Sequence, residues 1–203
     1  MTEASMRPRI GVLAIQGDYA AHAEALAAQG AEPVEVRNPE ELTGVDGLIL
    51  PGGESTTMLK FLAKHHFFEA LKEYCGHHPV FGTCAGAILL AREVRNPEQL
   101  SLGVLDAVVE RNAYGRQIDS AILTAPTELA GGPLEMVFIR APRIVEIGAK
   151  VQVLAQRDGF PVLVRQGNVM AATFHPELSS DRRVHRLFVE LVAAASTMQK
   201  TES

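Results

Sequence analysis

The feature that most constrains the fold is a cysteine between two glycines, in Gly82-Thr83-Cys84-Ala85-Gly86. Glycine two positions before and two positions after the central residue is the spacing of a sharp turn from a strand into a helix, with a nucleophile at its apex. Such a turn brings backbone against backbone and can hold its central residue in a sparsely populated conformation. We therefore predict a strand, an elbow and a helix here, with the thiol pointing out of the turn.

The residues on either side agree with this prediction. Pro79-Val80-Phe81 is apolar and prone to form a strand, and Ala85 to Arg92 has the composition of a helix. A thiol at a helix N-terminus faces unpaired N–H groups and the positive end of the helix dipole, which favour the thiolate. The alternative is a buried structural cysteine at a helix start, because short motifs also occur by chance.

The first half of the chain alternates strand-like and helical segments. Strands are expected at Ile10–Ile15, Pro33–Arg37, Gly47–Leu50 and the elbow, and helices at Tyr19–Gln29, Met58–Lys64 and Phe67–His77. This order is typical of an α/β protein with a doubly wound, mostly parallel sheet and a site at the carboxyl ends of its strands. We predict a three-layer αβα sandwich of the flavodoxin-like type.

The second half changes to short β runs separated by turn residues. These runs are Leu102–Glu110, Ser120–Leu123, Met136–Arg140, Val151–Gln156, Val162–Arg165 and Val169–Phe174. Turns such as Asp158-Gly159 predict hairpins between them. A final amphipathic helix is expected to start near Ser179-Ser180-Asp181 and to pack on the sheet. Because no repeat or linker is visible, residues 1–203 are expected to form one domain.

Composition limits the possible partners. The chain has 19 Lys and Arg against 24 Asp and Glu, a net charge of −5 and no Trp, so we expect no nucleic acid partner. No apolar run has the length of a membrane span or a signal core, which predicts a cytoplasmic protein without membrane contact. The two cysteines, Cys75 and Cys84, form no Cys-x-x-Cys pair. Neither a disulfide framework nor a metal or other cofactor is therefore expected.

A thiolate nucleophile needs a base, and the base needs an orienting group. His175 ends an apolar run, in Phe174-His175-Pro176-Glu177, and the two-residue spacing to Glu177 can aim both side chains to one side. We predict that His175 faces Cys84 and that Glu177 holds the imidazole. For this motif alone, an ordinary turn is the alternative. The remaining histidines are expected in solvated or capping positions: His22, His65, His66, His77, His78 and His185.

A glycine loop, Pro51-Gly52-Gly53-Glu54-Ser55-Thr56-Thr57, follows the third expected strand. It would present backbone N–H groups at the carboxyl edge of the sheet, where an anionic group could bind. It lacks the Gly-x-x-x-x-Gly-Lys pattern, so a phosphate loop is not expected. A simple strand-to-helix turn is the alternative.

The elbow together with the downstream His-Pro-Glu resembles the class I, triad-type glutamine amidotransferases. A closer resemblance, to the glutaminase subunits of pyridoxal phosphate synthases, is carried by Gly11–Gly17, Pro51–Thr57, Arg111–Gln117, Phe138–Pro142 and Phe174–Leu178. It extends from about Ile10 to Val192. One segment departs from that family, because Asp119-Ser120 is followed by Ala121-Ile122 rather than by an aromatic and an acidic residue.

The resemblance implies a glutaminase that converts L-glutamine to L-glutamate and ammonia. In that reading Cys84 attacks the side-chain amide, His175 protonates the departing ammonia and then activates water, and Glu177 orients His175. Backbone N–H groups of Gly53 and Ala85 would hold the oxyanion. The implied substrate-binding residues are Gly53, Glu54, Ser55, Arg111, Ile139 and Arg140. For the arginines, a surface salt bridge is the alternative.

The resemblance also implies a partner, the synthase (lyase) subunit of pyridoxal phosphate synthase, which receives the ammonia and switches the glutaminase on. Gln16-Gly17 is a candidate element for docking or for ordering the oxyanion site. Three alternatives remain: a glutaminase that serves another acceptor synthase, a cysteine hydrolase that needs no partner, and a non-catalytic regulatory module. Arg111–Gln117 and Phe138–Pro142 argue against the first of these.

Overall fold

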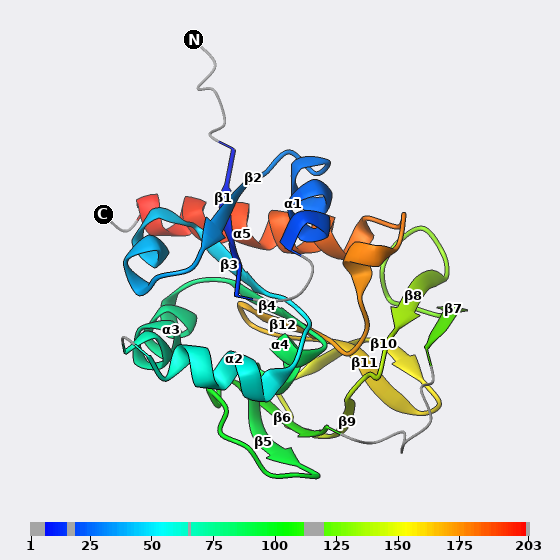
Figure 1. The fold of residues 1–203 in the computed structure, drawn as a ribbon. Coiled ribbons are helices and arrows are strands. Elements are labelled where there is room, and N and C mark those ends of the chain that lie inside the picture. The colour runs from blue at the N-terminus through cyan, green and yellow to red at the C-terminus, as the bar shows by residue number, and fades with distance from the viewer. Residues whose placement is uncertain (1–6, 16–18, 65, 112–119, 202–203) are drawn as a thin grey trace.

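A central sheet organises the computed structural model, which describes residues 7–15, 19–64, 66–111 and 120–201. Within those ranges the sheet has seven strands in the order β10-β11-β12-β4-β3-β1-β2 (Figure 1). The parallel strands are β1 (Arg9–Leu13), β2 (Glu32–Val36), β3 (Gly47–Leu50), β4 (Val80–Thr83) and β12 (Val169–Ala172). An antiparallel pair, β10 (Gln152–Arg157) and β11 (Phe160–Gln166), extends the sheet beyond β12. The predicted mostly parallel sheet is confirmed.

Helices cover both faces of this sheet. On one face, α1 (Tyr19–Ala27) and α5 (Arg183–Thr201) pack in a core that includes Ile49 and Phe81. On the other face, α2 (Ser55–Leu62), α3 (Phe67–His77) and α4 (Ala85–Leu90) pack in a core that includes Leu48 and Val80 (Figure 1). Alternate residues of a strand point to opposite faces. The strands β3 and β4 are therefore buried throughout, and Gly47–Leu50 is a continuous apolar run.

Two smaller sheets lie beside the central one. One contains β5 (Ala91–Arg95), β6 (Leu105–Glu110) and β9 (Arg143–Ile147), and the other contains β7 (Ala121–Ala125) and β8 (Leu134–Phe138). The segment that departs from the resembled family forms the start of β7, where Ile122 is largely exposed.

The predicted helix Ala85–Arg92 was wrong at its C-terminal end. Helix α4 stops at Leu90, and Ala91 begins β5, which pairs in parallel with β6. The apolar run around Leu90 is compatible with either a helix or a strand, so tertiary pairing decides between them. Strands β5 and β9 were not predicted, because the polar residues of each leave only a weak alternation.

Two short 3₁₀ helices complete the described chain, η1 (Pro39–Gly44) and η2 (Pro176–Leu178). Helix α2 begins at Ser55, three residues before the predicted start, because the side chain of Glu54 caps it by accepting from the N–H groups of Thr56 and Thr57. Among the helices in the described ranges, none has both the length and the apolar character that crossing a bilayer requires.

Candidate active site

The predicted triad and the glycine loop follow three neighbouring strands. Cys84 comes directly after β4, Gly52 follows β3, and His175 follows β12. Strand β4 pairs in parallel with both β3 and β12, so the carboxyl ends of all three lie at one edge of the sheet. That edge is where α/β sheets of this kind bind ligands.

The elbow has the strained geometry that its glycines predict. Cys84 has φ of 47° and ψ of −103°, a conformation rarely adopted by residues other than glycine. A Cβ on Gly82 would lie 2.5 Å from the carbonyl carbon of Gly86, and a Cβ on Gly86 would overlap the carbonyl oxygen of Leu50. The N–H of Cys84 donates to the carbonyl of Ala172 at 2.8 Å, which ties the elbow to β12.

Cys84, His175 and Glu177 lie together and are almost completely buried. The imidazole Nδ1 of His175 lies 2.7 Å from Oε1 of Glu177. Burial acts to lower the pKa of His175, but hydrogen bonds with Cys84 and Glu177 outweigh it and raise this pKa to about 10. The arrangement therefore favours a protonated imidazole between a sulfur atom and a carboxylate.

The glycine loop packs against the ring of His175. A Cβ on Gly52 would lie 2.5 Å from the ring carbon Cε1, so only a hydrogen atom fits between the loop and the imidazole. On the other side, the backbone N–H of His175 donates to the carbonyl of Val137 in β8 at 2.8 Å. The ring is thus held by both its hydrogen bonds and its neighbours.

The next residues of the loop meet Arg111. Gly53 has φ of 129°, in the region that favours glycine. Hydrogen bonds, chiefly from the Thr56 hydroxyl, lower the pKa of Glu54 to about 2, so this carboxylate is ionised at neutral pH. Arg111, whose side chain is 15% exposed, lies 3.5 Å from the Glu54 carboxylate. The hydroxyl of Ser55 is buried and donates its hydrogen bond to Gln99 at 2.8 Å, so its proton is not available to a ligand.

Ile139 and Arg140 follow β8 in a turn. Arg140 has φ of 45° and is exposed, and Ile139 is 37% exposed. The hydrogen bond between His175 and Val137 places this turn near the base. Ala85 is buried as the first residue of α4. Gln16, Gly17 and the part of the Arg111–Gln117 motif after Arg111 lie outside the described residues.

The prediction of solvated or capping histidines was wrong for two of them. His22 in α1 and His185 in α5 have no exposed surface. The signal for burial was helical spacing, since His22 shares a face with Leu26 and His185 shares one with Phe188. His66 and His77 are exposed, His78 stacks on Tyr74, and His65 lies outside the described residues.

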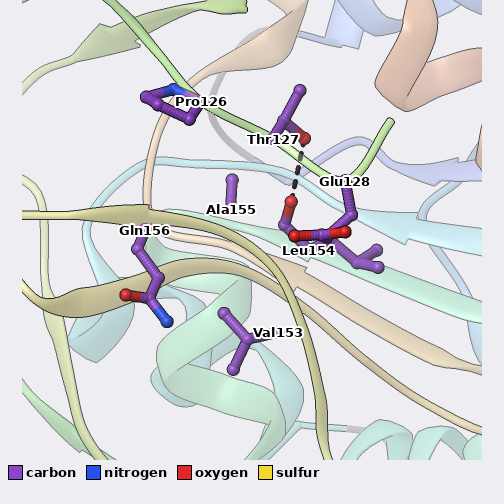
Figure 2. A pocket seen from close by; sticks show the side chains of 7 residues that line it. All are labelled: Pro126, Thr127, Glu128, Val153, Leu154, Ala155 and Gln156. Carbon is purple, nitrogen blue, oxygen red and sulfur yellow. Dashed lines mark hydrogen bonds between the residues drawn. The ribbon is translucent and has the colours of Figure 1, made fainter. Parts of the chain in front are cut away.

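A cavity of about 400 Å³ lies away from these residues, between β10 and the segment after β7 (Figure 2). Its lining residues are Pro126, Thr127, Glu128, Val153, Leu154, Ala155 and Gln156. None is a predicted site residue, and the Thr127 hydroxyl is satisfied by the carbonyl of Leu154 at 2.8 Å. Across the described ranges, no group of three or more His, Cys, Asp or Glu side chains is arranged to hold a metal ion.

Comparisons with known proteins give consistent results. Residues 12–194 match the SNO glutamine amidotransferase family. The chain is 57% identical over 192 residues to pyridoxal 5'-phosphate synthase subunit PdxT of Koribacter versatilis, covering 95% of this chain and 100% of that protein. It is 53% identical to the PdxT subunit of Thermotoga maritima, covering 91% and 99%. A crystal structure described as a glutamine amidotransferase superposes with a TM-score of 0.82 at 50% identity, covering 90% and 98%.

Proposed function

The chain belongs to the SNO glutamine amidotransferase family, and from this premise we propose that it is the glutaminase subunit of a pyridoxal 5'-phosphate synthase. It hydrolyses L-glutamine to L-glutamate and ammonia, and the ammonia passes to a synthase subunit. The observation that carries this proposal is the buried contact of Cys84, His175 and Glu177 beside a glycine loop. Sulfur, imidazole and carboxylate in this order form a nucleophile, a base and an orienting group.

The first chemical step follows from this geometry. Because Nδ1 of His175 pairs with Glu177, its Nε2 is left to serve Cys84. The thiolate attacks the side-chain carbonyl carbon of glutamine, and the C–N bond breaks as Nε2 of the imidazolium donates its proton to the leaving nitrogen. The products of this step are ammonia, a neutral imidazole and a glutamyl thioester on Cys84.

The second step regenerates the thiol. Neutral His175 takes a proton from a water molecule as the water oxygen attacks the thioester carbonyl carbon. The C–S bond breaks, glutamate leaves, and the proton held by His175 returns to the sulfur or remains shared with it. Glu177 stabilises the imidazolium, which is present before the first step and forms again in the second.

The oxyanion of both tetrahedral intermediates needs donors that are already in place. We assign this role to the backbone N–H of Ala85, which is in the first turn of α4 where helical N–H groups lack an intrahelical acceptor. The N–H of Gly53 is the second donor. Its positive φ gives the loop a conformation that a larger residue would adopt only with strain.

The α-carboxylate and α-ammonium of glutamine require charged partners. Arg140 and Arg111 supply guanidinium groups of the kind that bind carboxylates in a fork. The carboxylate of Glu54, ionised at neutral pH, can accept from the ammonium group. Ser55 and Ile139 complete the proposed substrate-binding set, with Ser55 contributing backbone rather than its committed hydroxyl.

A synthase subunit is the proposed partner, because the curated relatives carry the name of a synthase subunit. Ammonia released into water would be protonated and diluted, so a receiving site must be close at hand. Strand β1 pairs in parallel with β3, so its carboxyl end lies at the same edge of the sheet as the site. Gln16-Gly17 comes three residues later in the sequence, outside the described residues, and remains our candidate for contact with that partner. We place the complex in the cytoplasm, without nucleic acid.

The test is glutamate release from L-glutamine by the purified chain, with and without its synthase subunit. Wild type is expected to turn over when the partner is present, and Cys84→Ala is expected to show no turnover. The matched control is Cys75→Ala, because burial raises the pKa of the Cys75 thiol to about 12 and makes it unreactive. Cleavage that persists in Cys84→Ala, or no cleavage by wild type with its partner, would contradict the proposal.

A further inference from the structure

Two buried histidines lie behind the proposed triad, and its chemistry does not use them. His22 on α1 and His185 on α5 have no exposed surface, although they are far apart in the chain. Nδ1 of His22 lies 3.0 Å from Nε2 of His185. Nε2 of His22 faces Glu177, 3.4 Å from Oε2, which is the carboxylate oxygen that His175 does not contact. A continuous row of polar side chains therefore leads from α5 to the base.

Both buried rings are neutral at neutral pH. Burial is the main cause that lowers the pKa of His22 well below its ordinary value, and the nearby His185 and His175 add to it. Burial likewise lowers the pKa of His185 to about 3, with the charge of Arg182 as a second cause. A neutral imidazole has one N–H donor and one acceptor nitrogen, so the positions of the two protons decide which contacts are hydrogen bonds.

The contacts of the two nitrogens of His185 determine where the protons of both rings lie. Within the described part of the chain, Nδ1 of His185 has no hydrogen-bond partner. A buried N–H without an acceptor costs more than a lone pair without a donor, so the proton of His185 belongs on Nε2. That proton points to Nδ1 of His22, which must accept it. His22 then carries its own proton on Nε2, the nitrogen that faces Glu177.

From this arrangement we propose that His22 is a positioning residue that donates to Oε2 of Glu177 and fixes the plane of the carboxylate, and that His185 sets the tautomer of His22. Among the described residues Oε2 makes no hydrogen bond of ordinary geometry, and the 3.4 Å contact with Nε2 of His22 is the polar contact that the structure gives it. Without this donor the carboxylate could rotate and Oε1 would lose its alignment with His175. The Thr83 hydroxyl, 3.4 Å from Nε2 of His22, links the same ring to the residue before Cys84.

The inference rests on the proposed function, since it assigns a role in orienting the base of that reaction. Its effect should appear in kcat rather than in KM, because the row of side chains contacts the catalytic base and not the glutamine. A purely structural role predicts something else. Leucine at position 22 would then fill the buried volume, and any loss of activity would only follow the loss of stability that comes from leaving the N–H of His185 without its acceptor.

Three variants at one position separate these outcomes. His22→Gln places an amide N–H near the position of Nε2, so it can still donate to Glu177. His22→Asn has the shorter side chain, which reproduces Nδ1 and does not reach Glu177. His22→Leu offers no donor at all. Each is assayed for partner-stimulated glutamate release, for KM of glutamine and for its thermal unfolding midpoint.

We expect kcat of His22→Leu and His22→Asn to fall about tenfold or more, with KM within about twofold, because misplacing a catalytic group by a fraction of an ångström has effects of this order. His22→Gln should recover most of that loss at a similar unfolding midpoint. Wild-type kcat in folded His22→Leu or His22→Asn, or equal losses in the Asn and Gln variants, would overturn the proposal.

A measurement on the unaltered protein completes the test and does not depend on any variant folding. The ¹⁵N resonances of the imidazoles should show that His22 and His185 both carry their proton on Nε2 at neutral pH. A proton on Nδ1 of either ring would overturn the proposal. If wild type with its synthase subunit released no glutamate, the proposed function itself would fail, whereas full activity that ignores the residue at position 22 would remove only this inference.

Discussion

A methyl group at position 52 should displace the catalytic base without unfolding the chain. In Gly52→Ala the new Cβ would lie 2.5 Å from Cε1 of His175, whereas ordinary van der Waals contact begins at 3.4 Å. The imidazole or the loop must therefore move by about 1 Å. Gly52 does not have a left-handed φ, so its backbone accepts alanine, and the strain falls on the contact with the ring.

A displacement of about 1 Å in a catalytic group costs about a hundredfold in rate. We expect kcat for partner-stimulated glutamate release to fall by about this factor in Gly52→Ala, with an unfolding midpoint within a few degrees of wild type. The matched control is Gly76→Ala in α3, where a Cβ meets nothing within 4 Å. That variant should keep wild-type kcat and gain up to about 1 kcal/mol of stability from helix propensity.

The reasoning would be refuted if folded Gly52→Ala turned over glutamine at the wild-type rate. Such a result would mean that His175 does not act as the catalytic base from its observed position against Gly52. A loss of activity that was matched by Gly76→Ala would also refute it, because the effect would then not come from the contact with His175.

The other predictions concern the elbow, the charge state of the base and the buried rings. Gly86→Ala should unfold the chain or lower its thermal unfolding midpoint steeply, because the new Cβ overlaps the carbonyl of Leu50 in β3. An unchanged unfolding midpoint would contradict the close backbone approach described at the elbow. In Cys84→Ala the pKa of His175 should fall below about 10, because one of the two interactions that raise it is lost; an NMR titration that shows no decrease would contradict this. His22 and His185 are neutral when folded and bind protons when unfolded, so stability should fall as pH drops below about 6.5. His22→Gln should reduce the slope of the unfolding free energy against pH by about 1.4 kcal/mol per pH unit near pH 5. Denaturant unfolding of both proteins at several pH values measures these slopes, and equal slopes would contradict the prediction.

The buried strands and the elbow could be predicted because each depends on local sequence. Gly47–Leu50 is a continuous apolar run, and such runs form strands that are covered on both faces. The elbow could be read from its two glycines, since the close approach of backbones leaves no room for a side chain at either position. The order of strands and helices then predicted that the site lies at the carboxyl edge of the sheet.

Other features depend on contacts between distant segments, which the sequence does not state. Ala91–Arg95 becomes a strand because it pairs with β6, although the preceding apolar run favoured a longer helix. The helical spacing of His22 and His185 signals their burial, but the contact between them follows from the packing of α1 against α5, and the sequence gave no indication of that partnership. The contact between Gly52 and the ring of His175 arises because β3 and β12 flank β4.

The central claim is that Cys84 carries the glutamyl group between the two chemical steps. The most direct measurement is mass spectrometry of the chain after rapid acid quenching of its reaction with glutamine and the synthase subunit. The account predicts a glutamyl thioester on the peptide that contains Cys84, absent from Cys84→Ala and from His175→Ala. Turnover by wild type with no adduct on that peptide during the steady state, or with an adduct on Cys75 instead, would contradict it.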